Sequence, residues 1–279
     1  MMLLKLFAAL STLAAVLTGY FSDSFESLSW LWVLPLTFAG SFLACLVLAF
    51  LFLWLMSALA KQDPEQDGDD PFYRRLVEVY VEAICQVLQM KVDVRSLEKL
   101  PSEGRFMLVC NHLSLLDVVV LIWKLRGREL TFVTKKENMD MFIIGKLMGK
   151  IQCLPLDREN DREALKTILK AIALVKADKG SMGLFPEGTR SLDGKLHHFR
   201  SGGFKIAQKA NVPILVCTIQ NTNKVFRNFL HLKSTPVPLH LLEVIPAEEL
   251  KGVTTVAISD RVRGIMAADL GPDLVAEDE

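Results

Sequence analysis

The sequence predicts an α/β domain, with a mostly parallel or mixed sheet flanked by helices, that follows an N-terminal two-helix transmembrane hairpin. Two observations support this fold class. From residue 72 onward, short apolar runs alternate with segments of helical periodicity, which is typical of a sheet covered on both faces. Before residue 61, two long segments are almost wholly apolar, and each reaches the roughly 20 residues that a membrane-spanning helix needs.

The two apolar segments cover residues 1–21, whose one charged side chain is Lys5, and residues 27–60, which carry no charge. A signal peptide is the alternative for the first segment, because Lys5 precedes an apolar run. No clear small-residue cleavage site precedes a polar start, and the second apolar segment follows almost at once, so a helical hairpin is favoured. Pro35 is expected to divide the second segment into an interfacial part and a spanning helix that ends near Trp54.

The charges around the hairpin predict its orientation. The connector, residues 22–29, contains Asp23 and Glu26 but no lysine or arginine. The outer ends are flanked by four basic residues, Lys5, Lys61, Arg74 and Arg75. Because loops rich in lysine and arginine stay on the cytoplasmic side, we expect a cell (inner) membrane location with the folded domain facing the cytoplasm.

Composition divides the chain further. We expect a membrane anchor at 1–60, an acidic linker at 61–71, one domain at 72–269 and a frayed acidic tail at 270–279. The net charge is +0, so composition gives no indication of a nucleic-acid partner. The five cysteines form no C-x-x-C pair, which predicts buried free thiols in a reducing compartment and no metal site.

Periodicity assigns the elements of the domain. Strands are predicted at 106–110, 130–134, 152–156, 182–185, 214–219 and 240–245, and helices at 74–90, 115–125, 161–177, 203–210 and 254–267. Several polar stretches directly follow these strands, at the edge where α/β sheets place their ligands.

The stretch from Asn111 to Asp117 (NHLSLLD) follows the first predicted strand. On one continuous helix, His112 and Asp117 would lie roughly 140° apart and could not touch easily. If His112 lies in a turn and Asp117 in the first helical turn, with Ser114 as N-cap, the histidine can fold back over the helix start. A carboxylate bonded to one ring nitrogen then fixes the tautomer, and the other nitrogen can act as a general base.

Two alternatives remain for this stretch. Ser114 and Asp117 match an S-x-x-D capping box, which would make His112 an ordinary turn residue. Cys110 and His112 would share a face if the strand continued, as in a cysteine–histidine nucleophile pair. Cys110 ends an apolar run, however, where a small buried residue needs no further explanation.

A second stretch, FPEGTRS at 185–191, follows another predicted strand. Gly188 permits a tight turn with free backbone N–H groups, Thr189 can donate a hydroxyl, and Arg190 offers a planar fork of donors suited to a phosphate. The alternative is an ordinary turn with a surface arginine. Lys135 and Arg158 also follow predicted strands, although a solvated charge is the commoner fate of any one such residue.

Together, N-H-x-S-x-x-D and F-P-E-G-T-R-S resemble the glycerolipid acyltransferase superfamily, especially bacterial-type 1-acylglycerol-3-phosphate acyltransferases. The first block matches at Asn111, His112 and Asp117, and the second throughout 185–191. The chain also resembles further blocks of the family, at Phe142, Gly145, Arg158, Phe199, Gly202, Ala207 and the V-P-I run at 212–214. The chain departs from the pattern at Val216, where the family has proline.

The resemblance implies direct acyl transfer. His112, held by Asp117, would take the proton from a free glycerol hydroxyl, which attacks the carbonyl of a thioester. It implies no metal, no resident cofactor and no acyl-enzyme, with an acyl-CoA or acyl carrier protein thioester as co-substrate. The substrate-binding residues expected from it are Asn111, Lys135, Arg158, Glu187, Gly188, Thr189 and Arg190.

The expected reaction acylates the sn-2 hydroxyl of 1-acylglycerol-3-phosphate and gives phosphatidic acid, in phospholipid biosynthesis. The expected partners are the lysophospholipid acceptor, the acyl thioester donor, the lipid bilayer and, for one donor, acyl carrier protein. One alternative is another acceptor, such as glycerol-3-phosphate or a different lysophospholipid. A non-catalytic membrane scaffold is disfavoured because His112, Asp117 and Arg190 are all present.

Overall fold

The structure is a computed structural model that describes residues 2–61, 69–157 and 159–276. The chain separates into two compact units, residues 1–61 and 62–279. Residues 62–68 of the predicted linker lie outside the described residues. Asp69 and Asp70, which were expected to end that linker, are part of the second unit, because Asp70 accepts hydrogen bonds from the backbone N–H groups of Phe72 and Tyr73 at the start of a helix.

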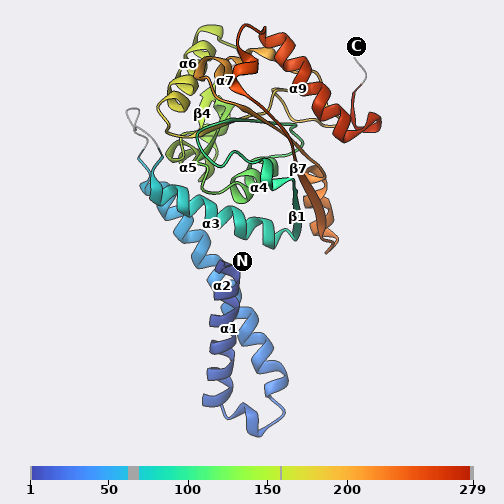
Figure 1. Cartoon of the computed structure of the whole chain (residues 1–279). Coiled ribbons are helices and arrows are strands. Elements are labelled where there is room, and N and C mark those ends of the chain that lie inside the picture. Colours follow the sequence, from blue (N-terminus) through green and yellow to red (C-terminus); the bar gives the residue numbers. More distant parts are fainter. Residues whose placement is uncertain (1, 62–68, 158, 277–279) are drawn as a thin grey trace. The chain divides into compact units, whose positions relative to one another are not determined.

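The first unit pairs two apolar helices, α1 (Met2–Phe21) and α2 (Trp30–Leu59), through the short 3-10 helix η1 (Ser24–Glu26) (Figure 1). α1 buries four residues at intervals of four, Phe7, Ser11, Ala15 and Gly19, which therefore share one face. A Cβ at Gly19 would come within 2.9 Å of the Leu34 side chain, so glycine permits the close approach of α2.

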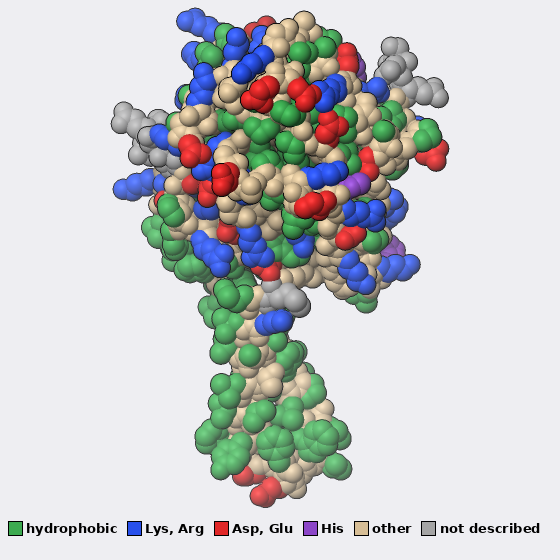
Figure 2. Space-filling model, in the orientation of Figure 1, with side chains coloured by type: hydrophobic (Ala, Val, Ile, Leu, Met, Phe, Trp, Pro, Cys, Tyr) green, Lys and Arg blue, Asp and Glu red, His purple; other side chains and the backbone are tan. Residues whose placement is uncertain are grey.

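Both helices are long and apolar enough to cross a membrane. Figure 2 shows apolar side chains over most of the visible surface of this unit. α2 continues through Pro35, so the predicted division of this segment is wrong. Pro35 is the sixth residue of a 30-residue helix and removes one N–H donor close to its start, which such a long helix tolerates.

The second unit is built on one mixed sheet with the strand order β1-β7-β6-β2-β5-β3-β4. The strands are β1 (Met90–Arg95), β2 (Met107–Cys110), β3 (Leu130–Lys135), β4 (Leu154–Leu156), β5 (Ser181–Leu184), β6 (Ile214–Ile219) and β7 (Thr235–Ile245). Strands β2 to β6 run parallel, β7 is antiparallel to β6, and β1 is parallel to β7. The predicted α/β class is confirmed, and the ends of β2 to β6 form a carboxyl edge.

Helices cover both faces of this sheet: α3 (Pro71–Val87), α4 (Leu116–Lys124), α5 (Ile144–Lys150), α6 (Asp161–Lys176), α7 (Lys205–Ala210), α8 (Val225–Leu230) and α9 (Thr255–Leu270). Figure 1 shows α6, α7 and α9 on one side and α3, α4 and α5 on the other. The central strands β2 and β6 are buried along their whole length, which explains why they are continuous apolar runs in the sequence.

Two strand predictions were incomplete. β1 was missed although its sequence, MKVDVR, alternates apolar and polar residues, because it directly follows a helix that was predicted to run to residue 90. β7 begins five residues earlier than predicted, because Pro236 and Pro238 argue against a strand. Both prolines lie where β7 extends beyond β6 and pairs with β1 alone, so the missing N–H groups interrupt no ladder with β6.

The acidic tail does not fray over its described part, contrary to the prediction. Leu196 donates its backbone N–H to the carbonyl of Leu274 at 2.8 Å and accepts from Ala276 at 3.0 Å. This parallel bridge places Val275 against the apolar core. The charges of the predicted tail masked Leu270 and Val275, which pack against the apolar core.

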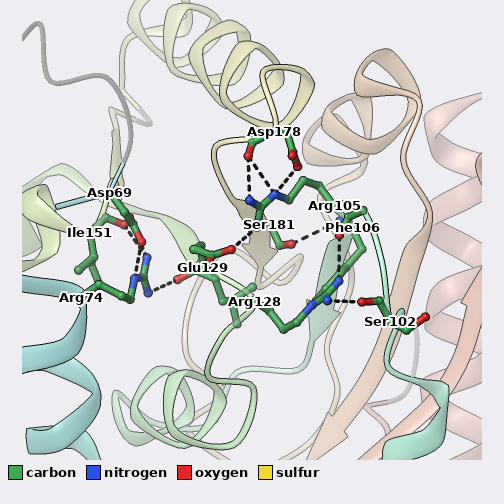
Figure 3. Close-up of polar contacts among 12 residues, drawn as sticks. Asp69, Arg74, Ser102, Arg105, Phe106, Arg128, Glu129, Ile151, Asp178 and Ser181 are labelled. Carbon is green, nitrogen blue, oxygen red and sulfur yellow. Dashed lines mark hydrogen bonds and ion pairs between the residues drawn. The ribbon is translucent and has the colours of Figure 1, made fainter. Parts of the chain in front are cut away.

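Two arginines form hydrogen bonds and ion pairs at the amino edge of the sheet (Figure 3). Arg74 in α3 donates to both carboxylate oxygens of Asp69, at 2.5 and 2.9 Å, and to the carbonyls of Leu130 and Ile151. Arg105, before β2, likewise bonds the carboxylates that precede β3 and β5, those of Glu129 and Asp178. Arg74 is 8% exposed, so it stabilises the fold and is unsuited to the role of a membrane-flanking charge.

We predict that Arg74→Ala lowers the free energy of unfolding of the second unit by about 3 kcal/mol, because it leaves the Asp69 carboxylate and two carbonyls without their donor. Arg75→Ala is the matched control, since the Arg75 side chain is 60% exposed, and should cost less than about 0.5 kcal/mol. Urea unfolding of the full chain in detergent, followed by circular dichroism, measures both. Equal effects of the two substitutions would contradict the prediction.

Candidate active site

The candidate active site lies where three neighbouring parallel strands end at the carboxyl edge. The order β6-β2-β5 brings together the turn after β2 with His112, the loop after β5 with residues 185–191, and the turn after β6 with Thr222. The first two are bonded directly, because the backbone N–H of Ser191 donates to the carbonyl of His112 at 2.8 Å. The sheet therefore joins the two stretches that the sequence singled out.

His112 and Asp117 form the predicted pair. The Nδ1 atom of His112 lies 2.8 Å from Oδ2 of Asp117, and the side chains are 15% and 0% exposed. Because a carboxylate only accepts, Nδ1 carries the proton of the neutral imidazole and Nε2 has a free lone pair. Among the described residues, Nε2 has no hydrogen-bond partner, so it can accept a proton from a substrate.

The Asp117 carboxylate is held by four donors. Its Oδ2 atom accepts from the backbone N–H groups of Leu113 and Ser114, at 2.7 and 2.8 Å, as well as from His112. Its Oδ1 atom accepts from the hydroxyl of Thr222. Thr222 is fully buried and was missed by the sequence analysis, since a threonine after a strand is common and nothing local relates it to Asp117.

Helix α4 begins at Leu116, and its N-cap is Leu115 rather than the predicted Ser114. The Ser114 hydroxyl accepts instead from the N–H of Leu116 at 3.2 Å, while Asp117 bonds back to the N–H of Ser114. The capping interaction and the bond to His112 thus occur together, because the Asp117 carboxylate accepts hydrogen bonds from both the helix start and the histidine.

Asn111 fixes the start of this turn. Its side-chain oxygen accepts from the N–H of Ile219 at 2.8 Å, and its amide donates to the carbonyl of Ile219 at 2.9 Å. Asn111 is 3% exposed. These contacts attach the His112 turn to the end of β6, and the expected binding of substrate by Asn111 stays a prediction.

Glu187 connects the loop after β5 to His112. Its carboxylate accepts from the backbone N–H of His112 at 2.8 Å and from that of His197 at 3.1 Å. Burial raises the pKa of the Glu187 carboxyl, and the two N–H bonds oppose this shift. Gly188 has a φ of +77°, and a Cβ there would lie 3.0 Å from the Arg200 side chain, so the loop needs glycine.

An aromatic stack supports the imidazole from one side. The His112 ring stacks on Phe185 with a centroid distance of 4.1 Å, and Phe185 stacks on Phe132 at 5.7 Å. A Cβ at Gly183 would lie 2.3 Å from the Phe132 ring, so glycine in β5 makes room for the stack. The sequence analysis recognised Phe185 only as part of a motif.

The cationic and hydroxyl candidates differ in position. Thr189 and Arg190 are exposed in the loop that contacts His112. Lys135 is exposed at the end of β3, two strands away from β2, and pairs with Glu137 at 3.0 Å. Arg158 lies outside the described residues. Of these candidates, Arg190 directly precedes Ser191, whose backbone N–H donates to the carbonyl of His112.

Cys110 does not suit the covalent alternative. It is fully buried, and burial raises the pKa of its thiol well above the usual range, with further contributions from Cys217, Asp117 and Glu187. Its sulfur lies 3.8 Å from Oδ1 of Asn111. Within residues 2–61, 69–157 and 159–276, no three His, Cys, Asp or Glu side chains group as metal ligands would.

Comparisons with known proteins agree with this geometry. A family model described as Acyltransferase matches residues 91–220. A chloroplastic 1-acyl-sn-glycerol-3-phosphate acyltransferase of Brassica napus, BAT2, is 37% identical over 137 residues, which cover 48% of this chain and 39% of that protein. A probable 1-acyl-sn-glycerol-3-phosphate acyltransferase of Mycoplasma pneumoniae is 32% identical over 182 residues, 62% of this chain and 67% of that protein. The matched part spans less than half the length of the plant relatives.

A solved structure shares the fold. The crystal structure of the 1-acyl-sn-glycerophosphate (LPA) acyltransferase PlsC from Thermotoga maritima superposes with a TM-score of 0.58 at 23% identity, covering 79% of this chain and 88% of that chain. The family model and the Mycoplasma pneumoniae relative confirm the predicted family: the chain belongs to the acyltransferase family that includes 1-acyl-sn-glycerol-3-phosphate acyltransferases.

Proposed function

We propose that this protein transfers a fatty acyl group from a thioester donor to the sn-2 hydroxyl of 1-acylglycerol-3-phosphate, forming phosphatidic acid at a membrane. The observation that supports this most is the buried pair of His112 and Asp117, whose free Nε2 atom adjoins a loop with an exposed arginine. The names of the relatives supply the substrate class.

The reaction needs one base and no covalent intermediate with the protein. Nε2 of His112 takes the proton of the acceptor hydroxyl as its oxygen attacks the thioester carbonyl, and Asp117 stabilises the imidazolium that forms. The tetrahedral intermediate collapses and breaks the C–S bond. The imidazolium then returns the proton to the departing thiolate, so His112 is restored and an ester and a thiol are released.

Arg190 is the residue to which we assign the acceptor's phosphate. Among the described residues its guanidinium has no hydrogen bond or ion pair, so its planar fork is available to two phosphate oxygens. Ser191 ties this loop to the backbone of His112, which fixes the phosphate relative to the base. Lys135 and Thr189 are secondary candidates because both are exposed.

The apolar helices α1 and α2 support a membrane location, since both acceptor and product carry acyl chains that partition into lipid. We place the second unit on the cytoplasmic side, because the α1–α2 connector has acidic but no basic residues. The thioester donor is carried by coenzyme A or by acyl carrier protein, and both release a thiol in the same step.

We expect His112→Ala to reduce turnover by about 10²–10⁴-fold, because it removes the general base. Cys110→Ala is the matched control, since it alters a buried residue two positions before His112 and removes the alternative nucleophile; it should retain most activity. Product masses from labelled donors and a panel of acceptors, including glycerol-3-phosphate, measure both effects and the acceptor. Full activity of His112→Ala, or loss only in Cys110→Ala, would overturn the mechanism; preference for another acceptor would overturn the assigned substrate.

Thr222→Val should lower kcat about tenfold, because a buried carboxylate oxygen loses a charge-assisted hydrogen bond. The KM for the acceptor should change little, because Thr222 contacts Asp117 and not the loop that carries Arg190. Thr218→Val is the control: Thr218 is a similarly buried threonine that bonds Asp269 at 2.5 Å. Its kcat should stay close to that of the unmodified protein, and equal kcat values for all three proteins would contradict the role of Thr222.

Arg190→Ala should raise the KM for the phosphorylated acceptor by about ten- to a hundredfold, the equivalent of one or two charge-assisted hydrogen bonds. Turnover at saturating acceptor should change far less, since the base is intact. Arg95→Ala, at the end of the outermost strand β1, removes another exposed arginine, separated from β5 by the strands β7, β6 and β2, and should have no effect. An unchanged KM in Arg190→Ala would exclude Arg190 as the phosphate ligand.

A further inference from the structure

One segment at the carboxyl edge exposes large apolar side chains together with positive charge. It comprises residues 224–233, which include α8 and the turn after it, and we call it the α8 tip. Phe226, Leu230 and Leu232 are 57, 80 and 83% exposed. The tip also carries Lys224, Arg227 and Lys233, all exposed, and the sequence has no Asp or Glu between residues 211 and 242.

The conformation of Leu232 is a second, independent observation. The N–H of Leu232 donates to the carbonyl of Phe229, and that of Lys233 to the carbonyl of Asn228, each at 2.9 Å. This is a Schellman motif, in which Leu232 occupies the left-handed position with a φ of 54°. Glycine favours that position, and leucine there is strained. Leu232 contributes little to the stability of the isolated fold, because its side chain is also exposed.

The α8 tip is close to the catalytic groups along the chain. It begins two residues after Thr222, whose hydroxyl bonds Asp117. The loops after β3 and β5 end in further exposed apolar residues at the same edge, Phe142 at 73% and Leu192 at 96%. The arginines at the amino edge, Arg74 and Arg105, instead form ion pairs with carboxylates of the same unit.

We propose that the α8 tip is a lipid-binding surface of the second unit, which inserts Phe226, Leu230 and Leu232 at the headgroup boundary while its cations contact anionic lipid. An amphipathic segment with apolar residues flanked by Lys and Arg binds a membrane surface in this way. This surface belongs to the second unit, whereas the apolar helices α1 and α2 form the first. The inference depends on the proposed function in one respect, because that function locates the enzyme at a membrane.

A lipid surface fits the α8 tip better than an acidic protein does. A specific protein interface buries about 800 Å² on each partner, whereas the tip offers a six-residue helix and one turn. Its leucines project instead of lining a groove. Phe226 and Leu230 are four residues apart and share a helix face, and Arg227 lies beside them. An acidic carrier protein and a second copy of the chain are the competing occupants.

Spin labels on the full chain test this directly. In a Cys45→Ser background, in which the remaining cysteines are buried, single variants Phe226→Cys, Leu232→Cys and Val256→Cys are labelled and reconstituted into vesicles. Val256 is the control: it is 57% exposed, as is Phe226, but lies at the start of α9, after β7 returns to the amino edge. Accessibility to oxygen and to a water-soluble nickel complex is compared.

Vesicles containing phosphatidylglycerol should make the labels at 226 and 232 more accessible to oxygen than to nickel, while the label at 256 stays aqueous. The same result is expected with His112→Ala, so failure of the proposed catalysis leaves this outcome unchanged. Labels at 226 and 232 as aqueous as that at 256 would overturn the inference. So would labels that respond only to acyl carrier protein or to protein concentration.

Leu232→Gly separates docking from folding. It removes an exposed side chain and the strained backbone position, so thermal stability should be unchanged or higher. Oxygen accessibility at 226 should fall, and turnover of a short-chain, water-soluble acceptor should be retained. Replacing Lys224, Arg227 and Lys233 by glutamine should weaken docking to anionic vesicles about fivefold per cation. Unchanged docking in both variants would contradict the inference.

Discussion

The buried carboxylate of Asp117 is the constraint on which the active site depends. Burying an ionised group is unfavourable unless donors surround it, and Asp117 has four: the imidazole, two backbone N–H groups and the hydroxyl of Thr222. These donors come from the turn after β2 and the turn after β6. The carboxylate has all four hydrogen bonds only when both turns are in place, so correct folding of the edge and orientation of the imidazole are one event.

The sheet topology determines what each edge can do. Parallel strands β2 to β6 end together, and the turns that follow them carry the polar groups of the candidate site. At the opposite edge the preceding loops contain Arg105, Glu129 and Asp178, which satisfy each other in ion pairs. The charges at the amino edge thereby neutralise one another. The carboxyl edge keeps Arg190 without a partner among the described residues and a histidine nitrogen without a proton.

The sequence predicted those parts of the site that lie close together along the chain. His112 and Asp117 are five residues apart, and FPEGTRS is one loop, so local spacing and turn chemistry were sufficient. Contacts across strands were not predicted. Thr222 reaches Asp117 over 105 residues, and Asn111 reaches Ile219 over 108; neither has a local pattern that indicates its partner.

The fold shows the same limit. The buried strands β2 and β6 were found because a sheet covered on both faces makes them continuous apolar runs. The edge strand β1 alternates in polarity and needs β7 beside it to be a strand at all. Pro236 and Pro238 argued against a strand in the first half of β7. Whether a strand tolerates these prolines depends on where β6 ends, which is a tertiary property.

Glu187 shows why the two motifs occur together in one chain. Asp117 acts on the imidazole of His112, whereas Glu187 acts on the backbone, accepting from the N–H of His112 and of His197. The carbonyl of His112 in turn accepts from Ser191. Both backbone groups of His112 are therefore bound by the loop that carries Arg190. In the proposed mechanism a shift of this loop would move the base and the phosphate ligand together, so these bonds would set the distance between the acceptor's phosphate and its hydroxyl.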